Sequence, residues 1–245
     1  MARLSSVQRA SSVSSFITRV PAWLFVALLV LGAAGLWKLS VPARLARRLH
    51  AFQAGRHAET AVAAAAPQLH DGDLIFQTSQ SAQSRAIQLA TKSEYSHCGI
   101  LFRRGQEWRV YEAVQPVSET SLAKWVARGK DGRFVVKRLR DAKTVLTPQV
   151  LQRLQAAGRQ YQGKNYDLYF GWSDERIYCS ELLWKMYKTA TGREIGQLQT
   201  LREFDLSHPA VQAKLRERYG RNIPLDEKVI SPVRMLESKE LVTVR

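Results

Sequence analysis

Cys179, His97 and Glu112 are the residues of this 245-residue chain whose types and expected positions could perform thiol chemistry. Cys179 belongs to the stretch Tyr178–Tyr187, YCSELLWKMY, in which apolar residues recur at helical spacing after a polar loop. This spacing predicts a helix with Cys179 in its first turn. There, the positive end of the helix dipole and the unpaired backbone N–H groups favour a thiolate, which is the nucleophilic form.

A thiolate nucleophile requires a base, and the base requires an acceptor that orients it. His97 lies inside a predicted strand, whereas the other four histidines fall in the segment before the domain or in a loop (His50, His57, His70 and His208). If Arg104 and Gly105 form a two-residue hairpin turn, His97 pairs directly with Glu112 on the next strand, with Cβ atoms about 5 Å apart. A one-residue slip would put the two side chains on opposite faces.

The surrounding pattern mixes strands and helices, which predicts an α+β domain with a small, mostly antiparallel sheet. Strands are expected over 73–77, 96–102, 107–114 and 133–139, and at the C-terminus within 229–244. Helices are expected over 81–92, 121–129, 148–162, 207–220 and from Cys179 onward. Strand alternation puts His97 and Cys98 on opposite faces. If His97 faces Cys179, this alternation disfavours a disulfide between Cys98 and Cys179.

Several stretches together resemble one family. YSHCGILF (95–102), VYEAV (110–114) and YCSELLWKMY occur with DGDLIFQ (71–77), GKNYDLYF (163–170) and VISPVRMLESKELVTV (229–244). In this order they resemble the permuted papain-fold cysteine hydrolases, the YiiX/YebB-like relatives of the NlpC-type amidases. The resemblance covers nearly all of residues 70–245. It implies a circularly permuted papain-like fold, in which the histidine precedes the cysteine.

The resemblance implies a role for each residue. Cys179 would be the nucleophile, His97 the base and Glu112 the third polar residue. Tyr166 would be the second oxyanion donor, after the backbone N–H of Cys179, and Tyr95 and Tyr178 are the alternatives. Cys98 would fill the core and face away from the site.

Each residue also has a structural interpretation: a strand histidine, a solvated glutamate and a core cysteine are common in proteins without activity. Zinc ligation by His97, Cys98 and Cys179 is disfavoured because alternation separates the first two and no fourth ligand is evident. Asp71 and Asp73 flank a glycine before a strand, which is typical of a turn rather than of a metal site. The sequence predicts neither a metal nor a cofactor.

The composition favours an anionic partner. The net charge is +16, and residues 71–245 alone carry 29 basic against 20 acidic residues. Such an excess suits an anionic membrane surface or a cell-wall polymer. No aromatic-plus-basic RNA motif or basic zipper is present, so nucleic acid is not expected. Two cysteines are too few for a disulfide framework.

The sequence before residue 68 predicts a membrane attachment. Residues 1–19 are basic and expected to be disordered, and residues 20–37 are 18 consecutive uncharged, mostly apolar residues, which predicts a transmembrane anchor or a signal peptide. The composition of residues 38–67 predicts a basic juxtamembrane helix or linker. The resemblance implies that residues 68–245 are a permuted papain-like cysteine hydrolase domain. The prediction is a single-pass protein of a bacterial inner membrane, with the side of the catalytic domain left open.

The leading hypothesis is a membrane-anchored thiol hydrolase that cleaves an amide bond in a cell-wall peptide or a lipid-linked amide through an acyl-enzyme. One alternative is a lipid-directed acyltransferase or thioesterase that uses the same residues. Another is a catalytically idle module that binds anionic lipid or polymer. The sequence does not predict an oligomeric state.

Overall fold

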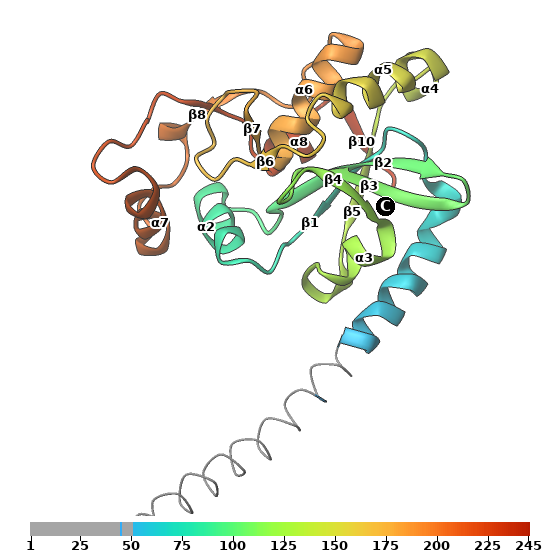
Figure 1. Ribbon diagram of the computed structural model, residues 1–245, viewed down its shortest axis with the longest axis horizontal. Helices are drawn as coiled ribbons and strands as arrows, with labels where there is room; N and C mark the ends of the chain where they lie inside the picture. The colour runs from blue at the N-terminus through green and yellow to red at the C-terminus, as the bar shows by residue number, and fades with distance from the viewer. Residues whose placement is uncertain (1–44, 46–50) are drawn as a thin grey trace, which may run out of the picture. The chain divides into compact units, whose positions relative to one another are not determined.

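The computed structural model describes residue 45 and residues 51–245, and Figure 1 shows them as a sheet with helices packed against it. The predicted disordered segment 1–19 and the predicted span 20–37 lie outside these residues, as does most of 38–50. Within the described part, no helix has the length and apolar composition that crossing a bilayer requires.

The core of the domain is a six-stranded sheet in which every neighbouring pair is antiparallel, as predicted. Its spatial order is β10 (Leu241–Thr243), β5 (Val135–Leu139), β1 (Leu74–Gln77), β2 (His97–Arg104), β3 (Glu107–Glu112) and β4 (Ser118–Ser121). Two short ladders lie outside it: β6 (Asn165–Tyr166) runs parallel to β7 (Arg176–Ile177), and β8 (Gln199–Thr200) runs antiparallel to β9 (Lys228–Val229).

The described helices are α2 (Ala82–Thr91), α3 (Leu122–Ala127), α4 (Ala142–Val145), α5 (Pro148–Arg159), α6 (Cys179–Thr191), α7 (Pro209–Tyr219) and α8 (Pro232–Leu236), preceded by a helix over 51–65. Short 3₁₀ turns occur at Ala66–Gln68, Lys130–Gly132 and Leu201–Glu203. The predicted helices therefore form in the described residues. The sequence patterns did not indicate α4, α8, β4 or the short strands β6, β7 and β8.

The two faces of the sheet bury separate cores. Cys98, Ile100 and Phe102 of β2 face the larger core, which contains the apolar sides of α5 and α6. Leu101 of β2 faces the second core, which contains α3 and the helix over 51–65. This alternation follows from the two-residue period of a strand, and because all of these side chains are buried, a shift by one residue would be costly.

The helix over 51–65 belongs to the basic segment 38–67. Its Ala58 and Ala65 are fully buried against the second core. The guanidinium of Arg245 donates a hydrogen bond of 2.8 Å to the carbonyl of Ala61, so the C-terminus is joined to this helix.

The β2–β3 register differs from the prediction by two residues. Arg104 pairs with Glu107, so the hairpin turn is Gly105–Gln106, and Ile100 lies opposite Tyr111. The prediction that His97 lies directly opposite Glu112 is therefore wrong. Gly105 has φ +61°, a left-handed conformation that glycine adopts without strain. It is the first residue of the observed two-residue turn, whereas the prediction made it the second.

Candidate active site

Cys179 is the first residue of α6. The Glu181 side chain accepts a hydrogen bond of 3.3 Å from the backbone N–H of Tyr178, which precedes the helix, and this bond fixes how the chain enters α6. The apolar side of α6 packs into the larger core, and Cys179 itself is 2% exposed. The thiol is therefore held at the positive end of a helix that tertiary packing anchors.

His97 and Glu112 meet across a glycine. The Nε2 atom of His97 lies 2.6 Å from Oε2 of Glu112, although their backbones are not directly opposite. A two-residue shift keeps both side chains on one face, and diagonal neighbours on a sheet remain within reach of long side chains. A Cβ built at Gly99 would lie 2.2 Å from Cγ1 of Val110, so the Val110 side chain can occupy the space beside residue 99 only because that residue is a glycine.

Three donors besides His97 hold Glu112. The Thr120 hydroxyl donates to Oε1 at 2.6 Å, the Trp125 indole N–H donates to Oε2 at 2.9 Å, and the Arg128 guanidinium pairs with both oxygens. Burial by itself would raise the pKa of this fully buried carboxyl, but the hydrogen bond and charge of His97, together with Arg128 and Thr120, lower it. Glu112 is thus an ionised acceptor and not a solvated surface charge.

Sequence reasoning missed Thr120, Trp125 and Arg128. Trp125 and Arg128 are three residues apart at the end of α3, a spacing that puts both on one helix face. That spacing was the available signal, but nothing in it indicated that the face would cover Glu112. The Trp125 ring also stacks on the His97 imidazole, with centroids 5.9 Å apart.

His97 is poised to carry a proton. Burial favours its neutral form, but the hydrogen bonds to Cys179 and Glu112 and their negative charges outweigh this effect and raise the pKa of His97 from 6.5 to about 9. Because Nε2 is committed to Glu112, Nδ1 is the ring nitrogen left to face the Cys179 thiol.

Cys98 contradicts the expectation that it faces away from the site. It points into the same core as Cys179, because α6 covers the face of β2 opposite to His97. The hydrogen bond from the Cys98 thiol, followed by the hydrogen bond and positive charge of His97, lowers the pKa of Cys179 well below the ordinary thiol value despite burial. The imidazole reaches the same sulfur because His97 is the first residue of its strand.

Tyr166 also reaches the thiol, with its hydroxyl 3.9 Å from Sγ of Cys179. The Gln83 amide donates to the same hydroxyl at 3.3 Å, and the Gln115 side chain accepts from the Tyr166 backbone N–H at 2.7 Å. Burial and the nearby Cys179 charge raise the pKa of Tyr166 well above its usual value, so the phenol stays protonated and can donate.

The two alternative tyrosines take other positions. The Tyr178 hydroxyl accepts a hydrogen bond of 3.0 Å from the backbone N–H of Ile230 inside the core. Tyr95 lines a different cleft, beside Lys130 and Phe134. Of the three candidates, Tyr166 is the one with its hydroxyl on Cys179.

Two hollows meet at this cluster. An apolar cavity with about 730 Å³ of empty space, part of it open to solvent, reaches Cys179 and Tyr166 between α2 and α7. Its apolar lining is Ala86, Ile87, Ala90, Phe170, Leu201, Phe204, Leu206, Val211, Leu215, Val229 and Ile230. A second cleft reaches His97 and Tyr166, and carbon atoms make up most of its exposed surface. We call it the polar cleft after the hydroxyl, amide and guanidinium side chains in its lining, which are Gln77, Ser79, Ser81, Gln83, Ser84, Ser96, Gln115 and Arg128.

One sequence relative and one solved structure match most of this chain. The protein YiiX of Escherichia coli strain K12 is 50% identical over 183 residues, which cover 75% of this chain and 89% of YiiX. A crystal structure of YiiX from Escherichia coli O157:H7, described as a metalloprotein, matches with a TM-score of 0.69 at 50% identity over 73% of this chain and 97% of that chain.

The description of that relative as a metalloprotein raises the question of a metal in this chain. Within residues 51–245 no three His, Cys, Asp or Glu side chains converge closely enough to hold a metal ion. Asp71 accepts a hydrogen bond from the backbone of Arg103, and Asp73 forms an ion pair of 2.7 Å with Arg138, so both serve the structure around the turn. The donor set of the described residues does not fit a metal ion.

The family comparison agrees with the fold and with the resemblance found in the sequence. Residues 68–245 match the family described as permuted papain-like amidase enzymes of the YaeF/YiiX type, C92 family. The α+β architecture, with its histidine strand preceding its cysteine helix, is the permuted papain-like arrangement. The chain belongs to the permuted papain-like amidase family that includes YaeF and YiiX.

Proposed function

We propose that this protein is a thiol hydrolase that cleaves an amide bond between an apolar acyl chain and a polar amine, with Cys179, His97 and Glu112 as its triad. The observation that carries the proposal is the continuous line of contacts from Glu112 through His97 to a cysteine at a helix N-terminus. This line supplies the nucleophile, the base and the orienting acceptor that acyl transfer requires.

In the first step the Cys179 thiolate attacks the carbonyl carbon of the amide. The protonated His97, held by Glu112, then donates its proton to the leaving nitrogen as the C–N bond breaks. The product is a thioester on Cys179 and a free amine. Neutral Tyr166 and protonated His97 both face the sulfur. The positive charge of His97 balances the negative charge of the Cys179 thiolate, so the Cys179–His97 pair carries no net charge.

The negative charge that develops on the carbonyl oxygen needs donors in place before the reaction. The backbone N–H of Cys179, at the first position of α6, is one donor, and the Tyr166 hydroxyl is the second. Such fixed donors typically contribute about 3 kcal/mol to the transition state. Gln83 and Gln115 are positioning residues, because they hold the hydroxyl and the backbone of Tyr166.

In the second step His97, now neutral, takes a proton from water. The resulting hydroxide attacks the thioester carbonyl, and the C–S bond breaks to release the acid and regenerate the thiolate. The polar cleft beside His97 is the side from which both the leaving amine and the incoming water can reach the imidazole.

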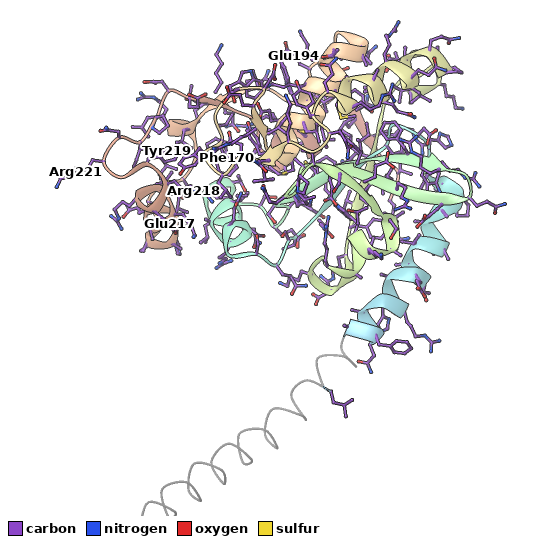
Figure 2. All side chains as sticks on the ribbon, in the orientation of Figure 1. Phe170, Glu194, Glu217, Arg218, Tyr219 and Arg221 are labelled. Atoms are coloured by element: carbon purple, nitrogen blue, oxygen red, sulfur yellow. The ribbon has the colours of Figure 1, made fainter. Side chains whose placement is uncertain are left out.

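The chemistry of the two hollows supports an amphiphilic substrate. The apolar cavity starts at Cys179 and suits an acyl chain, whereas the polar cleft at His97 suits the amine half. Lys214 and Arg218 of α7 lie at the cavity, and the Arg218 guanidinium is 5.2 Å from the centre of the Phe170 ring (Figure 2). A lipid-linked amide fits this pair of hollows better than a cell-wall peptide, whose polar backbone would enter an apolar cavity at a cost.

Acyl transfer is a second candidate, and the apolar cavity is the observation that favours it. A thioester seated there can pass its acyl group to a hydroxyl in the polar cleft instead of to water, and a thioester substrate can enter by the same route. Product analysis separates these reactions, because transfer yields an ester of the added alcohol and hydrolysis yields the free acid.

We also propose attachment to a bacterial membrane through residues 20–37, with the basic segment on anionic lipid. Leu45 and Phe52, which follow the predicted span, are 58% and 63% exposed, as expected for side chains that enter a lipid interface. Co-sedimentation of the full chain with anionic and neutral vesicles tests this proposal. Equal binding to both kinds of vesicle would refute the proposed attraction of the basic segment to anionic lipid. Absence of binding to either would refute the proposed membrane attachment.

A chain-length series tests the proposed substrate. The full chain is assayed with N-acyl amides of one polar amine, from acetyl to dodecanoyl, by release of the amine. Each methylene that enters the cavity is worth about 0.8 kcal/mol, or roughly a fourfold gain in kcat/KM, until the cavity is full. Ala86→Phe, which fills the cavity, should abolish the gain, and Ala156→Phe on the exposed side of α5 should keep it.

The control for turnover is Cys179→Ala, which should release no amine with any substrate. A flat chain-length series would refute the assignment of the acyl chain to the cavity. Binding of the amides without turnover by the wild type would leave the lipid-binding module as the better description. Consumption of cell-wall peptides in preference to acyl amides would contradict the proposed substrate class.

A further inference from the structure

The proposed nucleophile has a second cysteine as its neighbour. Cys98 of β2 and Cys179 of α6 are buried in the same core and are free thiols. The strand and the helix that carry them pack directly on one another, with the two cysteines at the starts of their elements. The two residues are 81 positions apart in the sequence, but the packing of α6 on β2 brings both side chains into one core, where each thiol affects the ionisation of the other.

The two thiols differ in their ionisation. The hydrogen bond from Cys98, followed by His97, lowers the pKa of Cys179. Burial, followed by its hydrogen bond to Cys179, raises the pKa of Cys98 well above the ordinary value. The cluster therefore pairs a thiol that ionises readily with a thiol that resists ionisation. In such a pair one sulfur reacts selectively with a peroxide, because the thiolate is the nucleophile that attacks the peroxide oxygen.

We propose that Cys98 is a resolving thiol, which forms a reversible disulfide with Cys179 after a hydroperoxide has oxidised Cys179. The Cys179 thiolate attacks the peroxide, the O–O bond breaks, and the released alkoxide takes a proton to become an alcohol. The sulfur of Cys98 then attacks the resulting sulfenic acid, the S–O bond breaks, and the hydroxyl leaves as water with the Cys98 proton. The two thiols together lose two electrons, and the peroxide gains them.

The disulfide protects the site. A sulfenic acid without a partner reacts with further peroxide to a sulfinic acid, and this step is irreversible for most proteins. A thiol held in the same core as the oxidised sulfur competes at high effective concentration with dilute peroxide. A dithiol reductant returns the two electrons and restores both thiols. Hydrolysis would stop while the disulfide persists, because the nucleophile is then bonded to Cys98.

Peptide mapping of the full chain tests the proposal without any substrate. Reduced protein is treated with an alkyl hydroperoxide in molar excess, remaining thiols are blocked, and trypsin digestion is done under non-reducing conditions. Trypsin releases Cys98 in the peptide 93–103 and Cys179 in the peptide 177–185. The expected product in the digest is these two peptides joined by a disulfide, with the loss of two hydrogens. Before digestion the oxidised chain should be a monomer, and dithiothreitol should restore both thiols.

Variants show whether Cys98 protects Cys179. In Cys98→Ala and Cys98→Val, the same treatment should convert the peptide 177–185 to the sulfinic form, which dithiothreitol does not reverse. Circular dichroism verifies that each variant folds. If one of the two variants does not fold, the other still tests the role of Cys98. The Cys179→Ala chain should leave Cys98 unoxidised, because its thiol is protonated.

The proposal is overturned if wild-type Cys179 is over-oxidised while the peptide 93–103 keeps a free thiol. It is also overturned if the disulfide joins two chains rather than two cysteines of one chain. Neither outcome depends on amide cleavage, so failure of the proposed hydrolysis and failure of the disulfide are separate results.

Discussion

Replacement of Glu112 by glutamine removes one charge from the proposed triad and keeps its shape. The carboxylate is one of two partners that raise the pKa of His97 from 6.5 to about 9, the other being Cys179. One pKa unit corresponds to about 1.4 kcal/mol, so the net stabilisation of the imidazolium is about 3 kcal/mol. An amide at position 112 can still accept a hydrogen bond, but it no longer offers a negative charge.

If Glu112 supplies roughly a third to a half of that stabilisation, Glu112→Gln lowers the pKa of His97 by about one unit. A less stable imidazolium stabilises the thiolate less, so the pKa of Cys179 rises by a similar amount. At a pH below the titration of Cys179, the thiolate fraction then falls about tenfold. Alkylation of Cys179 should become about tenfold slower there, while the plateau at high pH changes little.

The assay measures the rate of iodoacetamide labelling of the full chain against pH. Mass spectrometry of the peptides 177–185 and 93–103 separates Cys179 from Cys98 within one sample. The matched control is Glu119→Gln, the same chemical change on β4, where the carboxylate pairs with Arg104 away from the thiol. Circular dichroism verifies that both variants fold.

The expected result is a shift of the Cys179 profile to higher pH in Glu112→Gln and no shift in Glu119→Gln. A folded Glu112→Gln chain with an unshifted profile would refute the inference that the carboxylate acts on the thiol through His97. The Arg128 side chain is 41% exposed and can regain water when its partner loses the charge, so global unfolding is not expected.

Three further predictions concern the site and its support. Gly99→Ala should destabilise the domain by about 1–3 kcal/mol in urea unfolding, because the added Cβ collides with Val110, whereas Gly55→Ala has free space in a helix and should stabilise it by about 0.5–1 kcal/mol. With the acyl amide that gives the highest turnover, Tyr166→Phe should lower kcat by about 10²-fold with little change in KM, and unchanged kcat would remove Tyr166 from the oxyanion site. Burial raises the pKa of Glu181 from 4.5 to about 8, so the stability that its proton contributes is fully present below about pH 4.5 and is lost as the pH rises through about 8. Glu181→Gln should therefore melt above the wild type at about pH 9, with the difference vanishing near pH 5, and a difference independent of pH would contradict the raised pKa.

The sequence determined those features that depend on neighbours along the chain. The helical period after Cys179 placed the thiol at a helix start, and the two-residue period of the strands placed His97 and Glu112 on one face. That placement survived an error of two residues in the register, because an even shift does not change the face. Gly105 indicated the hairpin, but the residues around it did not determine whether the glycine is the first or the second residue of the turn.

Tertiary structure decided which side chains from distant segments surround these three. Strand alternation correctly separated Cys98 from His97, yet it led to the wrong expectation that Cys98 faces away from the thiol. The helix α6 covers the Cys98 face, and His97 lies at the first position of its strand, so both residues reach the same sulfur. Periodicity gives the face of a residue but not what packs on that face.

The partners of Glu112 and the two hollows depend on the same non-local packing. Trp125 and Arg128 hold the carboxylate because α3 packs on the second face of the sheet, and the apolar cavity exists because α7 lies beside α2. Hydrophobic burial drives such contacts without direction, so no local pattern specifies them. The sequence therefore determined the reactive groups and their elements, and only the assembled domain determined their electrostatic environment and the shape of the space beside them.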